Sequence, residues 1–125
     1  MPPKWIIKYY QAVDGNSPIY EFIEALPEKA IGKLVHTLAL LTEFGVQLRE
    51  PHVKKVSGTP IWELRILGED SIRIFYVAAK PQTFLLLHAI KKTKQKTPPK
   101  EIKIAIKRLD EYRKRVNLAL DHIAK

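Results

Sequence analysis

Three short apolar runs, separated by turn residues, occupy the centre of the chain. They read VKKVSGTPIWELRI (residues 53–66), GEDSIRIFYVA (68–78) and KPQTFLLLHAI (80–90), and the first contains a turn at residues 57–60 (Ser-Gly-Thr-Pro) between two short strands. Each run is rich in β-branched and aromatic residues, and glycine, proline or aspartate lies between them, as is typical of strands joined by tight turns. Strands joined by such short loops must pair as antiparallel neighbours. The sequence therefore predicts an antiparallel meander at the centre of the fold.

Helical patterns flank this meander. An aromatic strand at 4–10 leads into two helices, at 18–26 and 27–44, and Gly45 ends the second. A long helix opens at 97–99 (Thr-Pro-Pro) and carries an apolar stripe to the end of the chain. We therefore expect an α+β fold in one domain over residues 1–125, with the helices packed mainly on one face of the sheet.

Alternation along the strands predicts which side chains share a face. If the helices cover the face that carries Trp62 and Leu64, then Arg65 emerges on the uncovered face, where Arg73 of the next strand is its cross-strand neighbour. Two like charges side by side weaken a sheet. Either an anionic ligand lies between the two arginines, or acidic neighbours such as Glu63 pair with them.

The charge of the chain also favours an anionic ligand or partner. The chain has 22 Lys and Arg against 13 Asp and Glu, a net charge of +9, and residues 91–115 alone contribute eleven basic and three acidic residues. Such a field attracts nucleic acid, an anionic membrane or an acidic protein. The chain has no cysteine, no apolar stretch long enough to cross a membrane and no signal-peptide pattern. We therefore expect a protein that acts in the cytoplasm without inserting into a membrane.

Two lysines follow the third strand directly. Lys91 and Lys92 must project to opposite sides, so one of them shares the face of Arg65 and Arg73 whichever way the strand is turned. A basic tail that is merely solvated would contain the same lysines. Because this lysine segment continues directly from the arginine face, however, we favour anion binding. The same reasoning makes further lysines candidates for RNA contacts: Lys54, Lys55, Lys94 and Lys96.

Standard catalytic motifs are missing from the sequence. No phosphate-binding glycine loop is present, and the four histidines lack the spacing of metal ligands, so we expect neither a cofactor nor a metal. His88, inside the third strand, is either a buried structural histidine or a group that transfers protons. Tyr76 shares parity with Ile72 and Ile74, which favours a core position over a catalytic one.

The residues WELRI, SIRIFYV and LLLHAIKKTKQKTPPKEIKIAIKR resemble the signature of the phage-derived HigB-like branch of the RelE/ParE toxin superfamily, over about residues 18–115. The resemblance implies the toxin of a type II toxin–antitoxin pair that cleaves mRNA on the ribosome. It also implies neutralisation by a helix-turn-helix antitoxin, as a hetero-oligomer. Toxins of this kind use the ribose 2′-OH as the nucleophile and need no metal.

The resemblance also implies roles for particular residues. Arg73 matches the arginine that stabilises the phosphate, Arg65 a basic position on the preceding strand, and Lys91 or Lys92 the cation at the end of the next strand. His88 and Tyr76 remain the candidates for proton transfer. Some relatives have a catalytic tyrosine near the start of the last helix, but this chain has none there before Tyr112.

Two other functions fit the same residues. A ParE-like inhibitor of DNA gyrase would need no catalytic arginine face. A non-catalytic basic module that binds RNA or an acidic protein would need only the positive field. The paired arginines separate these alternatives, because only a nuclease requires them for chemistry.

Overall fold

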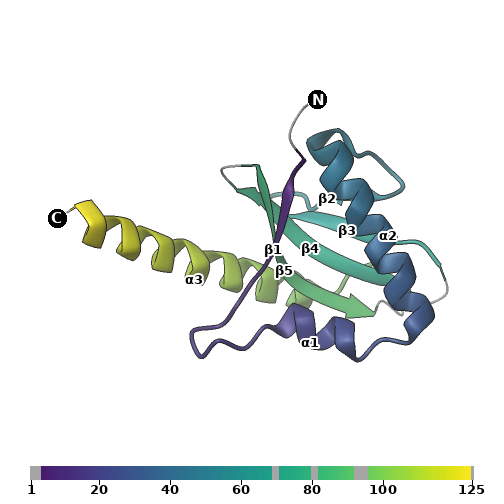
Figure 1. Cartoon of the computed structure of the whole chain (residues 1–125), viewed down its shortest axis with the longest axis horizontal. Helices are drawn as coiled ribbons and strands as arrows, with labels where there is room; N and C mark the ends of the chain where they lie inside the picture. Colours follow the sequence, from purple (N-terminus) through teal and green to yellow (C-terminus); the bar gives the residue numbers. More distant parts are fainter. Residues whose placement is uncertain (1–3, 69–70, 80–81, 92–95, 125) are drawn as a thin grey trace.

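A computed structural model describes residues 4–68, 71–79, 82–91 and 96–124, with the side chains of 118–124 left out. The sheet has five strands in the order β1-β5-β4-β3-β2, and three α-helices accompany it (Figure 1). The elements are β1 (Ile6–Tyr9), α1 (Pro18–Glu24), α2 (Glu28–Phe44), the 3-10 turn η1 (Gly45–Gln47), β2 (Val53–Lys55), β3 (Trp62–Ile66), β4 (Ile72–Ala79), β5 (Thr83–Lys91) and α3 (Pro99–Ala124).

The predicted α+β class and meander are confirmed. Strands β2 to β5 are consecutive antiparallel neighbours, while β1 adds to the free side of β5 in parallel and makes the sheet mixed. The helix ends follow the sequence signals. The Ser17 hydroxyl accepts a hydrogen bond from the Tyr20 N–H at the start of α1, and α2 ends at Gly45 with a positive φ of 56°. None of the helices in the described part of the chain is long and apolar enough to span a membrane.

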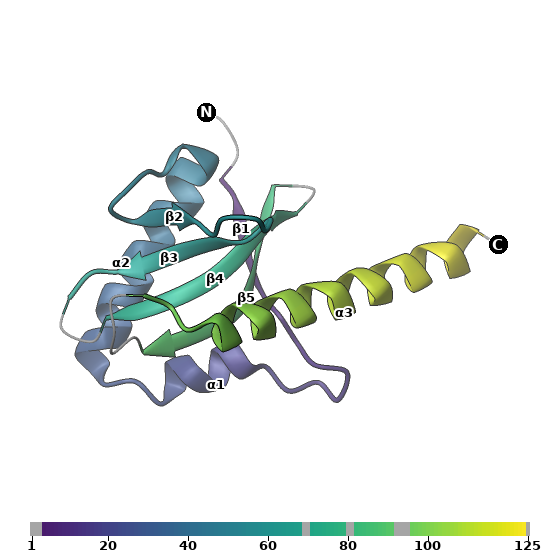
Figure 2. The same cartoon turned by 180° about the vertical axis from the view of Figure 1, so that it is seen from behind.

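The expectation that the helices pack mainly on one face is wrong. Helices α1 and α2 cover one face, where Leu34 and Leu41 pack in a core with Leu64 and Ile74. Helix α3 covers the other face, and Figures 1 and 2 show it on the side of the sheet opposite α2. There its buried side chains pack against a second core of sheet residues: Tyr10, Ile61, Phe75, Val77, Leu85, Leu87 and Ile90. Both faces of β4 and β5 are apolar, so the sheet needs a cover on each side.

A β-bulge in β5 sets which side chains reach the α3 face. Tyr76 pairs with Leu86, but Phe75 pairs with His88, so Leu87 is an extra residue without a partner in the register. Because one inserted residue reverses the alternation, Leu87 and His88 both lie on the α3 side. Helix α3 starts against this part of the sheet, and its later turns extend beyond the sheet (Figure 2).

Candidate active site on the α3 face of the sheet

The predicted arginine pair is present. Arg65 on β3 and Arg73 on β4 are directly opposite each other in the register, which brings their Cβ atoms to about 5 Å. Their side chains are 25% and 17% exposed, so each is largely packed away while part of it still meets solvent. The face is not uncovered as expected, because the segment before α3 and the first turns of α3 lie over it. The pair therefore lies in a partly enclosed site.

A buried carboxylate lies between the two guanidinium groups. Glu63, 5% exposed, has one carboxylate oxygen 3.8 Å from Nε of Arg65 and the other 3.6 Å from Nε of Arg73. The Thr97 hydroxyl, just ahead of α3, donates a hydrogen bond of 2.9 Å to Glu63 Oε1. Two cations and one anion leave a net charge of +1. Glu63 thus removes much of the repulsion between the arginines without neutralising the site.

The arginines keep capacity for a further anion. The two Nε–carboxylate distances exceed hydrogen-bond length, and neither buried Nε finds a hydrogen-bond partner among the described residues. Burial lowers the pKa of Arg73, Glu63 opposes that shift, and Arg65 adds to it. A guanidinium nevertheless stays protonated in proteins, so a phosphate would be met by permanent cations with several N–H donors.

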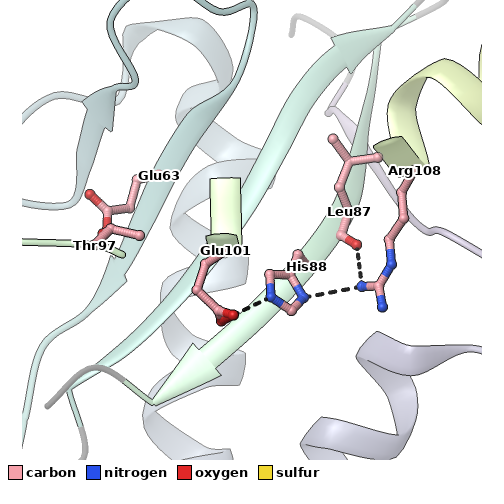
Figure 3. A network of polar contacts seen from close by, with 6 residues as sticks. All are labelled: Glu63, Leu87, His88, Thr97, Glu101 and Arg108. Carbon is pink, nitrogen blue, oxygen red and sulfur yellow. Dashed lines mark hydrogen bonds and ion pairs between the residues drawn. The ribbon is translucent and has the colours of Figure 1, made fainter. Parts of the chain in front are cut away.

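A second polar cluster joins β5 to α3 (Figure 3). Arg108 donates to Nδ1 of His88 at 3.1 Å and to the Leu87 carbonyl at 2.9 Å, and Glu101 Oε2 lies 3.2 Å from Nε2 of His88. A guanidinium can only donate, so Nδ1 must be the acceptor and Nε2 must carry the proton. Burial lowers the pKa of His88, and although Glu101 partly offsets this, Arg108 adds to it. His88 is therefore a neutral imidazole with both nitrogens engaged.

The two clusters share one face of the sheet. Glu63 pairs with Phe75, and Phe75 pairs with His88, whose ring stacks on the phenyl ring with 6.1 Å between centroids. Two strand spacings separate Glu63 from His88, about 10 Å. The start of α3 and the segment just before it hold both clusters, through Glu101 on one side and Thr97 on the other.

A family model now places the chain among known proteins. The model of the phage-derived Gp49-like proteins (DUF891) matches residues 21–110, more than two thirds of the chain. The chain belongs to the Gp49-like family. This is a RelE/ParE-like toxin family, and the matched range contains both polar clusters. No curated protein matches the sequence.

The remaining predicted residues of this Gp49-like protein are scattered. Tyr76 is buried in the core beneath α1 and α2, its ring edge-on to Phe84, and burial raises its pKa. Lys91 pairs with Ile72, whose side chain points into that same core, so Lys91 lies on the face opposite the arginines. Neither Tyr76 nor Lys91 therefore joins the arginine pair. Lys92, the alternative to Lys91, lies outside the described residues.

The candidate RNA-binding lysines divide between the two faces. Lys54 pairs with Glu63 and thus lies on the arginine face, where it is exposed. Lys55 lies on the other face, with its ammonium 5.1 Å from the centre of the Trp62 ring. Lys96 is exposed just before Thr97, and Lys94 lies outside the described residues.

The sequence assigns no catalytic role to three residues of the Gp49-like site. Glu63 has the same parity as Arg65 in WELRI, so alternation places it on the arginine face, and the alternative that it pairs with the arginines is confirmed. Glu101 and Arg108 are seven residues apart, which puts them on one side of a helix. That spacing was visible in the sequence, whereas the bulge that turns His88 toward them was not.

Taken together, the site offers two fixed cations, a buried carboxylate between them and a third cation, Lys54, on the adjacent strand. Such a set can bind a phosphoryl group and accept a proton next to it. The described residues contain no group of three His, Cys, Asp or Glu that could hold a metal ion. The cluster of His88 with Glu101 and Arg108 fixes the position of α3 over this site.

Proposed function

We propose that this Gp49-like protein is the toxin of a type II toxin–antitoxin pair, on the HigB-like branch of the RelE/ParE superfamily, and that it cleaves mRNA on the ribosome. The observation that carries the proposal is the arginine pair. Two directly opposed, partly buried arginines that share a single carboxylate leave a site with a net positive charge. Guanidinium groups suit the charged oxygens of a phosphorane transition state.

The chemistry we propose is an attack of the ribose 2′-oxygen on the adjacent phosphorus. The bond from phosphorus to the 5′-oxygen breaks, which leaves a 2′,3′-cyclic phosphate and a 5′-hydroxyl. Arg65 and Arg73 hold the non-bridging oxygens and stabilise the charge that develops on them. Lys54 adds positive charge from the same face.

Glu63 is the best candidate for the proton transfers. It is the carboxylate adjacent to both arginines, and Thr97 occupies only its Oε1. In this proposal Glu63 accepts the 2′-OH proton and then returns it to the 5′-oxygen as that group leaves, so that no proton is gained or lost overall. His88 has both ring nitrogens engaged, so we assign it the role of positioning α3.

The experiment that tests this function maps the 5′ ends of mRNA after purified protein is incubated with translating ribosomes. Wild type should produce new 5′ ends, and Arg73→Ala should reduce the cleavage rate roughly 10²- to 10³-fold, the usual effect of removing one oxyanion donor. Arg113→Ala is the matched control, because Arg113 is an exposed arginine on α3. Thermal unfolding checks that both variants fold.

Three results would refute the nuclease mechanism. If Arg73→Ala cleaves mRNA as fast as wild type, the arginine pair has no catalytic role. Growth arrest with intact mRNA and inhibited DNA supercoiling would instead indicate a ParE-like gyrase inhibitor. A protein that arrests no growth and cleaves nothing would be a binding module.

The proposal includes a partner and a place of action. We propose that the toxin acts on mRNA in the cytoplasm and is neutralised in a hetero-oligomer with a helix-turn-helix antitoxin. The net charge of +9 suits an acidic antitoxin segment. Co-expression with the product of an adjacent helix-turn-helix reading frame should restore growth, and failure to do so would contradict this pairing.

A further inference from the structure

A groove outside the arginine site carries positive charge. It lies between α2 and the ends of β2 and β3 and has a volume of about 450 Å³. We call it the α2 groove and define it by its lining residues: Lys29, Gly32, Lys33, His36, Thr37, His52 and Leu67. None of the lining residues that the structure describes is acidic. The groove thus concentrates two ammonium groups and two imidazoles.

The basic residues of α2 occupy one stripe of the helix. Lys29 and Lys33 are one turn apart, and His36 continues the same stripe a further turn along. Like charges at this spacing destabilise a helix. Neither lysine makes an ion pair within the part of the chain that the structure describes. An anion in the groove would turn this unfavourable arrangement into a favourable one.

Gly32 provides a second, independent indication. It lies in the interior of a 17-residue helix, where glycine is less favourable than alanine, and it lines the groove. A Cβ built on Gly32 meets no atom of the protein within 4 Å, so packing within the chain does not require a glycine there. A glycine on an exposed helix face lets a ligand approach the helix backbone closely.

The groove and the arginine side chains lie on opposite faces of the sheet, because α2 covers one face and Arg65 and Arg73 lie on the other, but both places are next to the end of β3. The Arg65 N–H donates to the His52 carbonyl at 2.7 Å, and Leu67 lies two residues beyond Arg65, about 7 Å along the strand. A ligand that occupies both places must be a flexible chain with regularly repeated negative charges. A single strand of RNA, with a phosphate at every nucleotide, has this chemistry.

We propose that the α2 groove is a second RNA-binding site, which takes the phosphate backbone of a strand that continues past the arginine pair around the end of the sheet. The inference rests on the proposed function, because it takes RNA to be the ligand of the arginine pair. Lys29 and Lys33 supply the point charges for the phosphates. Gly32 leaves room for the backbone of the strand.

The test measures the salt dependence of binding. The probe is a short, single-stranded, fully 2′-O-methylated RNA, which has no 2′-hydroxyl nucleophile. Lys29→Gln/Lys33→Gln should weaken binding and reduce the slope of log K against log salt by about 1.4, because each phosphate contact on a single strand contributes about 0.7. The matched control is Lys103→Gln/Lys107→Gln, which removes the same two charges at the same spacing from α3 and should leave the slope unchanged.

A second variant separates binding from folding. Gly32→Ala should raise the melting temperature by favouring the helix, and at the same time it should weaken RNA binding at least several-fold by filling the groove floor. Loss of affinity in a protein that has become more stable cannot be caused by misfolding. Unchanged affinity in Gly32→Ala would contradict the close approach.

The remaining outcomes also decide the matter. Equal slopes for the two double variants would show that only the general positive field acts, and would overturn the inference. Binding of polyglutamate without binding of RNA would also overturn the inference, because the ligand of the groove would then be an acidic protein segment. If wild type cleaves mRNA on ribosomes while Lys29→Gln/Lys33→Gln binds RNA with an unchanged slope, the groove inference fails and the nuclease function stands.

Discussion

Substitution of Glu63 by glutamine tests the electrostatic reasoning about the site directly. The change keeps the shape of the side chain and an acceptor for the Thr97 hydroxyl, but it removes the only carboxylate between Arg65 and Arg73 among the described residues. Two opposed arginines then face each other with no charge between them. We expect Glu63→Gln to destabilise the fold.

The magnitude follows from the geometry. The carboxylate–guanidinium distances of 3.6 and 3.8 Å are longer than hydrogen bonds, and both arginines reach solvent, so each contact contributes about 0.5–1 kcal/mol. The bond from Thr97 weakens from a charge-assisted to a neutral one, about 0.5 kcal/mol more. The free energy of unfolding should therefore fall by about 2 kcal/mol. For a chain of 125 residues this lowers the melting temperature by roughly 5–10 °C.

Chemical denaturation of a double-mutant cycle measures the effect. Glu63→Gln, Arg73→Gln and the double variant should show a coupling free energy of about 1 kcal/mol, because the double variant relieves the repulsion that the single Glu63 change creates. Sulfate should stabilise Glu63→Gln more than wild type by binding between the arginines. Glu43→Gln, an exposed position on α2, is the control. Additive effects and no sulfate response would refute the reasoning.

Three further outcomes follow from the structure. In the ribosome assay, Glu63→Gln should lose roughly 10²- to 10⁴-fold in cleavage rate if Glu63 transfers the proton, and full activity would remove it from the mechanism. Because the pKa of His88 is lowered from 6.5 in the folded state, the unfolded chain binds more protons around and below that pH, so wild type should lose stability as the pH falls below 6.5. His88→Gln should lack this part of the pH dependence in paired denaturation curves, and identical curves would contradict a lowered pKa of His88 in the folded state. Gly45→Ala should cost about 2–4 kcal/mol of unfolding free energy, because its Cβ would overlap the Trp5 ring at a positive φ. Gly58 also has a positive φ, but a Cβ there would meet no atom within 4 Å, so Gly58→Ala should cost less.

Local sequence signals were sufficient for the meander and for the arginine pair. The hairpin of β3 and β4 is short, and strict alternation in IWELRI and SIRIFYV fixes which side chains share a face. For this reason Arg65 and Arg73 were correctly predicted to be cross-strand neighbours. The start of α1 at Ser17 and the end of α2 at Gly45 follow from equally local chemistry.

Alternation could not predict the orientation of β5. FLLLHAI is apolar at successive positions, so no pattern reveals the extra residue at Leu87. Without that bulge, His88 would point toward α1 and α2, and Lys91 would lie on the other side of the sheet. The position of α3 is also non-local, since its apolar stripe fits either face. The sequence therefore predicted a basic face, with Glu63 as one possible partner of its arginines, but not the helix that covers it.

The parallel pairing of β1 with β5 has a consequence for the order of folding during synthesis. Ile6 pairs with Thr83, 77 residues later in the chain, so the first strand must wait for the last one before it joins the sheet. By contrast, Arg65 and Arg73 are eight residues apart and meet as soon as their hairpin forms. Thr97, which bonds the carboxylate between them, comes from the final third of the chain, as do Glu101 and Arg108, which hold the neighbouring His88. A nascent chain would therefore form the hairpin that carries both arginines early, and complete the candidate site only after most of the protein has left the ribosome.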